Sequence, residues 1–191
     1  MGKNNGGFIK MRIGISGAQG TGKTTLLNHL RLEDAFMDYD ICDEVTRRVK
    51  SYGLPINENG NDITQRLIMQ EHIVNVFMHP NMITDRTALD GFVYTQYLFK
   101  SGKVSAETLK YAQKVFERLI FKYDLLFYIE PQFNLEDDGV RSPSIMFRDR
   151  IVSYFDEVII HYELPIIRLT GSVKERVNQV ITTMKDIKDD N

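Results

Sequence analysis

The chain has 191 residues, 42% of them hydrophobic and 26% charged, and carries a formal net charge of −2. A chain of this length suits one α/β domain, and its near-neutral charge gives no strong attraction to nucleic acid or to an anionic membrane. The single cysteine, Cys42, excludes an internal disulfide and the paired-cysteine zinc patterns. No apolar run approaches the roughly 18 residues of a membrane span, so no membrane partner is expected and the expected location is the cytoplasm.

One domain is expected over residues 11–185, because no repeat or low-complexity linker marks a boundary within it. The polar, glycine-rich residues 1–10 are expected to form a disordered tail. The charged residues 186–191 are expected to fray in the same way. The sequence leaves the oligomeric state open.

Short apolar runs alternate along the chain with stretches of helical periodicity. The expected strands are residues 12–16, 39–42, 82–84, 125–129 and 164–169. The expected helices are residues 24–32, 44–52, 62–79, 88–99, 105–121, 144–161 and 172–184. This alternation predicts an α/β fold, with a parallel sheet of five strands and helices on both faces.

The helix expected from residue 62 has the most detailed signals. Asp62 is expected to cap its start, and Pro80 to end it. Five apolar residues recur in it at helical spacing: Ile63, Leu67, Ile68, Ile73 and Phe77.

A glycine-rich turn follows the first expected strand and matches the phosphate-loop pattern G-x-x-x-x-G-K-[ST] in full. Its residues are Gly17, Ala18, Gln19, Gly20, Thr21, Gly22, Lys23 and Thr24. Glycines let the backbone N–H groups wrap a polyphosphate, and the next helix presents its N-terminus to the same anion. Lys23 is expected at the β and γ phosphates and Thr24 at Mg²⁺. The pattern predicts a site for ATP and Mg²⁺, with Thr25 included in the ATP contacts.

The second expected strand ends in Asp43 and Glu44, followed by Arg47. Ligands of parallel α/β sheets bind beyond the carboxyl ends of the strands, which places these side chains near the substrate. Glu44 is a candidate base or hydroxyl-binding group, and Arg47 a candidate clamp for an anion. An exposed ion pair at a helix start is the alternative.

The third expected strand ends in Asp85 and Arg86, with Asp90 and Tyr94 close behind. Asp85 is expected to bind Mg²⁺ through water or to take the proton of an attacking hydroxyl. Arg86 and Asp90 are expected to bind the substrate, unless the acid and the arginine form a structural ion pair. Core packing is the favoured interpretation of Tyr94.

The segment 131–150 follows the fourth expected strand and contains Arg141, Arg148 and Arg150 among acids, prolines and a glycine. A flap of this kind brings arginines onto transferred phosphate and excludes water. We therefore expect a lid, with Arg141 and Arg148 as catalytic groups, in preference to a solvated charge run.

A small-residue turn, Thr170-Gly171-Ser172, follows the last expected strand. Gly171 is expected to let a purine ring lie against the backbone, while Ser172 caps the next helix. The four histidines show no metal-ligand grouping and are interpreted as structural or surface residues: His29, His72, His79 and His161.

Taken together, several runs of the sequence resemble the P-loop kinase group that contains the nicotinamide riboside kinase domain of bacterial NAD regulators. Related small kinase-like proteins are common in virus genomes, where they are often described as nucleoside or nucleotide kinases. The runs are GISGAQGTGKTTL, DEVTRR, ITDRTALDGFVY, DLLFYI, DGVRSPSIMFR and LTGSVKERV. The resemblance covers residues 12–180.

The resemblance implies a three-layer P-loop fold with the phosphate-loop strand in the middle of the sheet and an arginine-bearing lid. It places Lys23 and Thr24 at the phosphates and Mg²⁺. Around the acceptor it places Glu44, Arg47, Asp85, Arg86 and Asp90, and on the lid Arg141 and Arg148. Residues 57–62 depart from the family pattern, which leaves the acceptor open.

The leading function is phosphate transfer from ATP to a nucleoside or nucleotide. A kinase acting on nucleic acid is less favoured because of the near-neutral charge. A non-catalytic nucleotide switch is a third class. The sequence lacks the Asn-Lys-x-Asp signature of GTPases, which favours ATP over GTP.

Overall fold

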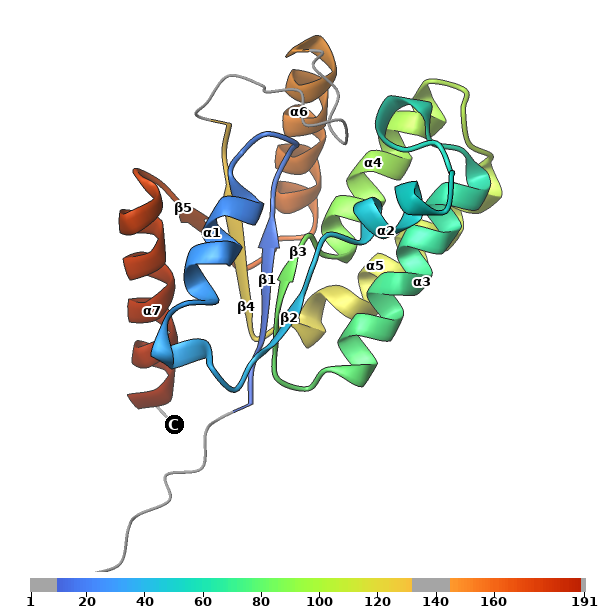
Figure 1. Cartoon of the computed structure of the whole chain (residues 1–191). Helices are drawn as coiled ribbons and strands as arrows, with labels where there is room; N and C mark the ends of the chain where they lie inside the picture. The colour runs from blue at the N-terminus through green and yellow to red at the C-terminus, as the bar shows by residue number, and fades with distance from the viewer. Residues whose placement is uncertain (1–9, 132–144, 190–191) are drawn as a thin grey trace, which may run out of the picture.

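A parallel sheet of five strands forms the centre of the molecule, in a computed structural model that describes residues 10–131 and 145–189 (Figure 1). The strands are β1 (Arg12–Ser16), β2 (Asp40–Cys42), β3 (Met82–Asp85), β4 (Leu125–Ile129) and β5 (Ile166–Leu169). Their order is β2-β3-β1-β4-β5, and every neighbouring pair is parallel. The five-stranded parallel sheet and the central place of β1 are confirmed.

Helices cover both faces of the sheet. They are α1 (Lys23–Leu30), α2 (Val45–Ser51), α3 (Asp62–Met78), α4 (Ala88–Lys100), α5 (Ala106–Leu119), α6 (Ile145–His161) and α7 (Val173–Asp189). Short 3₁₀ helices occupy Asp34–Phe36, Asn57–Asn59 and Ile120–Lys122, none of which the sequence predicted. Helices α1 and α7 lie on one face, and α3 to α6 on the other (Figure 1).

Alternation along the strands fills two separate cores. On β4, Leu125 and Phe127 pack with α1 and α7, while Leu126 and Tyr128 pack with α4, α5 and α6. Successive side chains of a strand point to opposite faces, so a strand buried on both sides reads as a continuous apolar run. This explains the continuous apolar run LLFYI of β4.

Helix α3 begins at the expected residue and ends at Met78, one residue before the expected end, but two details of the prediction are wrong. Its cap is Asn61, whose side chain accepts a hydrogen bond from the Thr64 backbone N–H. Asp62 accepts instead from Ser105, at the start of α5. Ile63 and Phe77 are 66% and 62% exposed, whereas polar side chains face inward. The buried polar residues of α3 are Thr64, Gln65, His72 and Asn75.

Other boundaries shift by small amounts. Helix α1 ends at Leu30 where residue 32 was expected, and β5 begins at Ile166 where 164 was expected. Most of the predicted N-terminal tail lies outside the described residues, as does residue Arg141 with most of the predicted lid. Helix α7 continues to Asp189 where residue 184 was expected, so it includes residues 186–189 of the predicted C-terminal tail. Within the described ranges, no helix is long and apolar enough to cross a bilayer.

Candidate functional site

The phosphate loop joins β1 to α1 at the carboxyl edge of the sheet. Gly20 and Gly22 have φ angles of 73° and 87°, a region that L side chains rarely adopt. A Cβ on Gly17 would lie 2.6 Å from the backbone oxygen of Ile129 on β4. The glycines are therefore required by backbone shape, and Gly22 directly precedes the first turn of α1.

Lys23 lies inside the loop. Its side chain is 95% buried, and its ammonium donates to the carbonyl oxygens of Gly17 at 2.7 Å and Ala18 at 2.6 Å. Burial, and then the neighbouring charge of Arg86, lower the pKa of Lys23 to about 8. The one flexible cation of the loop is thus held at its centre and loses its charge more readily than an exposed lysine.

Three side chains from outside the loop hold its backbone. Asp90 accepts from the Gly17 N–H at 3.2 Å. The Tyr94 hydroxyl accepts from the Gln19 N–H at 3.2 Å and donates to the Gln19 side-chain oxygen at 2.6 Å. Arg176, fully buried on α7, donates to the Thr21 carbonyl at 3.0 Å. Tyr94 is buried in the core, as favoured, and its hydroxyl also holds the loop. Arg176 was missed, because its contact with the loop is not local in sequence.

Thr24 and Asp85 meet at the start of α1. The Thr24 hydroxyl donates to Oδ2 of Asp85 at 2.6 Å. Among the described residues, the other Asp85 oxygen, Oδ1, has no hydrogen-bond partner although it is buried. A hydroxyl beside a carboxylate with a spare oxygen fits a hard cation such as Mg²⁺, which prefers oxygen ligands.

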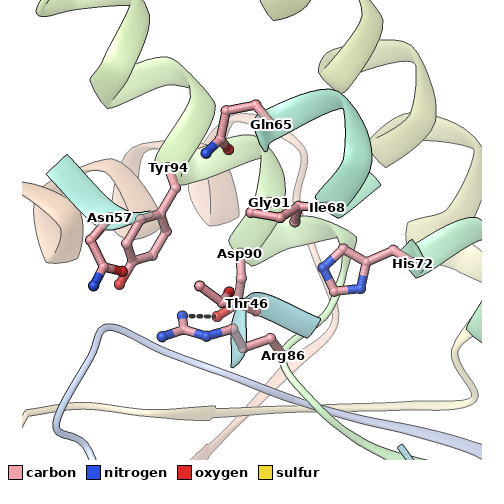
Figure 2. A pocket seen from close by; sticks show the side chains of 9 residues that line it. All are labelled: Thr46, Asn57, Gln65, Ile68, His72, Arg86, Asp90, Gly91 and Tyr94. Carbon is pink, nitrogen blue, oxygen red and sulfur yellow. Dashed lines mark hydrogen bonds and ion pairs between the residues drawn. The ribbon is translucent and has the colours of Figure 1, made fainter. Parts of the chain in front are cut away.

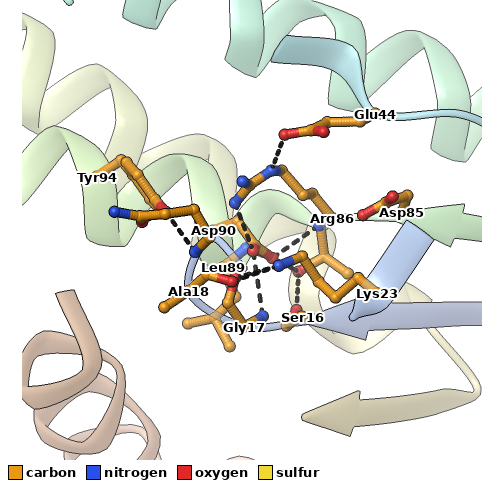
Figure 3. Close-up of polar contacts among 12 residues, drawn as sticks. Ser16, Gly17, Ala18, Lys23, Glu44, Asp85, Arg86, Leu89, Asp90 and Tyr94 are labelled. Atoms are coloured by element: carbon orange, nitrogen blue, oxygen red, sulfur yellow. Dashed lines mark hydrogen bonds and ion pairs between the residues drawn. The ribbon is translucent and has the colours of Figure 1, made fainter. Parts of the chain in front are cut away.

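Glu44 and Arg86 form a buried ion pair beside the loop (Figure 3). The Nε of Arg86 donates to Glu44 Oε1 at 2.6 Å, and a second nitrogen lies 3.4 Å from Asp90. Arg86 has a φ of 77°, which strains a residue other than glycine. Such strain persists only where the surroundings fix the residue, as this buried network does. Arg47 lies on the exposed side of Glu44, with its Nε 3.2 Å from Oε2.

The pKa values of the Glu44 and Asp85 carboxyl groups are shifted in opposite directions. Burial alone raises the pKa of Glu44, but the charges of Arg86 and Lys23 outweigh it and hold that pKa below its ordinary value. Burial and the charge of Glu44 raise the pKa of Asp85 above its ordinary value. Neighbouring acids whose pKa values are pushed apart can take different roles.

A small polar pocket adjoins this network (Figure 2). It has a volume of about 20 Å³, room for about one water molecule. Polar groups from α2, α3, α4, Asn57–Asn59 and the turn between β3 and α4 line it: Thr46, Asn57, Gln65, His72, Arg86, Asp90 and Tyr94. His72, interpreted from the sequence as a structural or surface residue, lies in the wall of this pocket. Two of the four buried polar residues of α3, Gln65 and His72, line the pocket.

The remaining predicted residues lie around the loop. Thr25 is on the exposed side of α1. Gly171 has a φ of 83°, and the next residue, Ser172, exchanges hydrogen bonds with Glu175 as the predicted cap. Arg148 lies in the first turns of α6, with an Asp149 oxygen 3.7 Å from its Nε. The adjacent Phe147 packs against Tyr94, which brings this end of α6 toward the loop.

Comparison with known proteins agrees with this geometry. Residues 12–176 match the family described as AAA domain. No curated protein matches. A deoxyadenosine kinase structure from M. mycoides with dCMP and dCDP is similar at 15% identity and a TM-score of 0.68, covering 93% of this chain and 100% of that one.

Two other solved structures share the fold. NadR in complex with NAD and AMP-PNP has 12% identity and a TM-score of 0.68, with 92% of this chain and 49% of that chain covered. Thymidylate kinase from Candida albicans has 13% identity and a TM-score of 0.62, with coverage of 95% and 94%. The predicted resemblance to this kinase group is confirmed, and the chain has a kinase-like P-loop fold.

Proposed function

The chain belongs to the AAA-domain family, and from that premise we propose that it is an ATP- and Mg²⁺-dependent phosphotransferase acting on a nucleoside or nucleotide. The observation that carries the proposal is the position of the polar pocket. A phosphate loop and a pocket lined by hydrogen-bonding groups lie on either side of one buried cluster, Glu44, Asp85, Arg86 and Asp90. A donor and an acceptor bound on the two sides would meet at these charges.

On the donor side, the loop N–H groups and Lys23 would bind the phosphates of ATP. Phosphates can replace the loop carbonyls as partners of the Lys23 ammonium, and their charge would keep the lysine protonated. Gly171 would lie near the base of the nucleotide, since α7 contacts the loop through Arg176.

Thr24 and Asp85 would hold Mg²⁺, Asp85 directly or through water. When bound, this ion neutralises charge on the phosphate oxygens. The raised pKa of Asp85 fits a group that has a cation as its natural partner.

On the acceptor side, Glu44 is the better candidate for the base. The acceptor hydroxyl oxygen would form a bond to the γ-phosphorus while the bond from that phosphorus to the β,γ-bridging oxygen breaks. The proton released from the hydroxyl needs an ionised acceptor, and the lowered pKa keeps Glu44 ionised at neutral pH. Arg86 fixes the orientation of Glu44 and, with Arg47 and Asp90, would position the acceptor.

The test is transfer of labelled γ-phosphate from ATP to nucleosides, nucleoside 5′-monophosphates, nicotinamide riboside and DNA, with and without Mg²⁺. We expect a small-molecule acceptor to be labelled only when Mg²⁺ is present. Labelling of DNA alone would replace the proposal with a nucleic-acid kinase. Binding of ATP without transfer to any of these would support a nucleotide switch.

A further inference from the structure

The imidazole of His72 lies at the wall of the polar pocket (Figure 2). The side chain comes from the middle of α3 and is 1% exposed. In the described part of the chain, neither Nδ1 nor Nε2 has a hydrogen-bond partner. The ring lies close to Gly91 on α4, where a Cβ would lie 3.4 Å from His72 Cδ2 and 2.5 Å from Met69 Sδ.

Two buried nitrogens without hydrogen-bond partners lower the stability of the fold. A polar group that leaves water without gaining a partner destabilises the fold, and an apolar side chain of similar size would avoid that cost. Burial, and then the charge of Arg86, lower the pKa of His72 to about 3. The ring is therefore neutral at physiological pH and offers one donor and one acceptor.

A second polar group of the pocket is already oriented. The Thr95 hydroxyl on α4 donates to the side-chain oxygen of Gln65 at 3.0 Å. The amide thus has one end fixed by α4 while the residue lines the pocket together with His72. Tyr94 and Ile68 supply a ring and an apolar surface to the same pocket. This combination suits a flat group with polar edges.

We infer that His72 determines acceptor specificity by hydrogen bonding, together with Gln65, to a planar group that carries a donor and an acceptor on its edge. This inference rests on the proposed function, because it places the polar edge of the acceptor's planar group in the pocket, where that edge takes the space of the one water molecule that about 20 Å³ can hold. A nucleobase and a carboxamide share this chemistry, and both occur in the acceptors of the transfer panel. His72 acts on binding of the acceptor and takes no part in the transfer of phosphate.

The inference is tested by binding, which does not require transfer. Dissociation constants are measured by calorimetry for four deoxynucleosides, their 5′-monophosphates, nicotinamide riboside and 1,2-dideoxyribose, which lacks a base. The proteins are the wild type, His72→Leu, His72→Gln and the exposed-site control His29→Leu. ATP binding and the thermal unfolding midpoint are measured for each protein.

We expect His72→Leu to weaken the best planar ligand by about tenfold to 100-fold, the scale of one or two lost hydrogen bonds. ATP affinity and the weak binding of 1,2-dideoxyribose should stay within about twofold. His72→Gln should recover most of the affinity, because an amide also offers a donor and an acceptor. The unfolding midpoint of His72→Leu should equal or exceed that of the wild type.

Other results would overturn the inference. The first is an equal loss of affinity for the planar ligands and for 1,2-dideoxyribose. The second is a leucine variant that binds the best planar ligand within threefold of wild type. The third is a wild type that binds no planar ligand. His72→Met repeats the comparison if the leucine variant does not fold. Selective binding of nicotinamide riboside would identify a carboxamide, and selective binding of one nucleoside would identify a base.

The outcome is separable from that of the proposed function. Binding that depends on His72 without transfer of phosphate would refute the kinase and leave the recognition site intact. Transfer of phosphate whose acceptor preference is unchanged in the His72 variants would refute the recognition site and leave the kinase intact.

Discussion

The phosphate loop and the polar pocket lie next to each other but are built in opposite ways. The loop is one contiguous run of eight residues, and the ammonium of Lys23 donates to two carbonyl oxygens of the same run. The pocket is assembled from five segments of the chain spread over residues 46–94, and the nitrogens of His72 have no partner among the described residues. The loop suits a ligand common to many proteins, whereas the pocket suits a ligand particular to this one.

Lys23→Ala should give the largest difference between the effect on phosphate transfer and the effect on acceptor binding. We expect transfer to fall by about 10³-fold or more, because the substitution removes the flexible cation at the β and γ phosphates. Acceptor binding to the polar pocket should change by less than about threefold. Steady-state transfer and acceptor calorimetry measure both effects, with the exposed Lys50→Ala as control. Near-normal turnover would contradict the phosphate-loop mechanism.

Arg148→Ala tests whether the start of α6 contributes to catalysis at the phosphate loop. An arginine that contacts the transferred phosphate in the transition state is worth about 10³-fold in rate. We expect turnover to fall on that scale while ATP affinity changes far less, and the same for Arg141→Ala. Arg150→Ala, two residues further along α6, is the control for Arg148. Equal losses of rate and ATP affinity would assign these arginines to ground-state binding.

Asp85→Asn tests whether Asp85, which lies between the phosphate loop and the polar pocket, acts in phosphate transfer. The amide keeps the size of the side chain, so nucleotide affinity should stay within about tenfold of wild type. Turnover should fall by about 10²-fold or more, the scale of a lost charged group at the reacting atoms. The exposed Asp43→Asn is the control. Unchanged turnover would make Asp85 structural, and Glu44→Gln would then be the decisive variant.

The smallest predicted effect is a pH dependence confined to the loop. With a pKa of about 8 in the free protein, Lys23 is charged below pH 8 and loses its proton above it. Bound phosphates favour the charged form, so the apparent dissociation constant of ATP should rise by about tenfold between pH 7 and pH 9. Adenosine, which has no phosphates, should bind equally at both pH values. A constant ATP affinity over this range would contradict the lowered pKa.

The same contrast explains what the sequence could predict. The loop was found in full because its function depends on backbone shape, and glycines at fixed spacing encode that shape locally. The strands were found because burial on both faces leaves continuous apolar runs, as in Leu125–Ile129. The candidates Glu44, Asp85, Arg86 and Asp90 were found because the carboxyl ends of parallel strands share one edge.

Tertiary structure decided how these residues are used. Asp90 and Tyr94 hold the loop through hydrogen bonds that join residues 73 and 75 positions apart, and no local pattern predicts such contacts. The inward face of α3 mixes apolar residues with polar ones, of which Gln65 and His72 line the pocket, so apolar periodicity alone could not identify this face. The sequence by itself determined the fold and the phosphate site, which depend on local geometry and burial. Only the packed structure determined which side chains meet in the pocket.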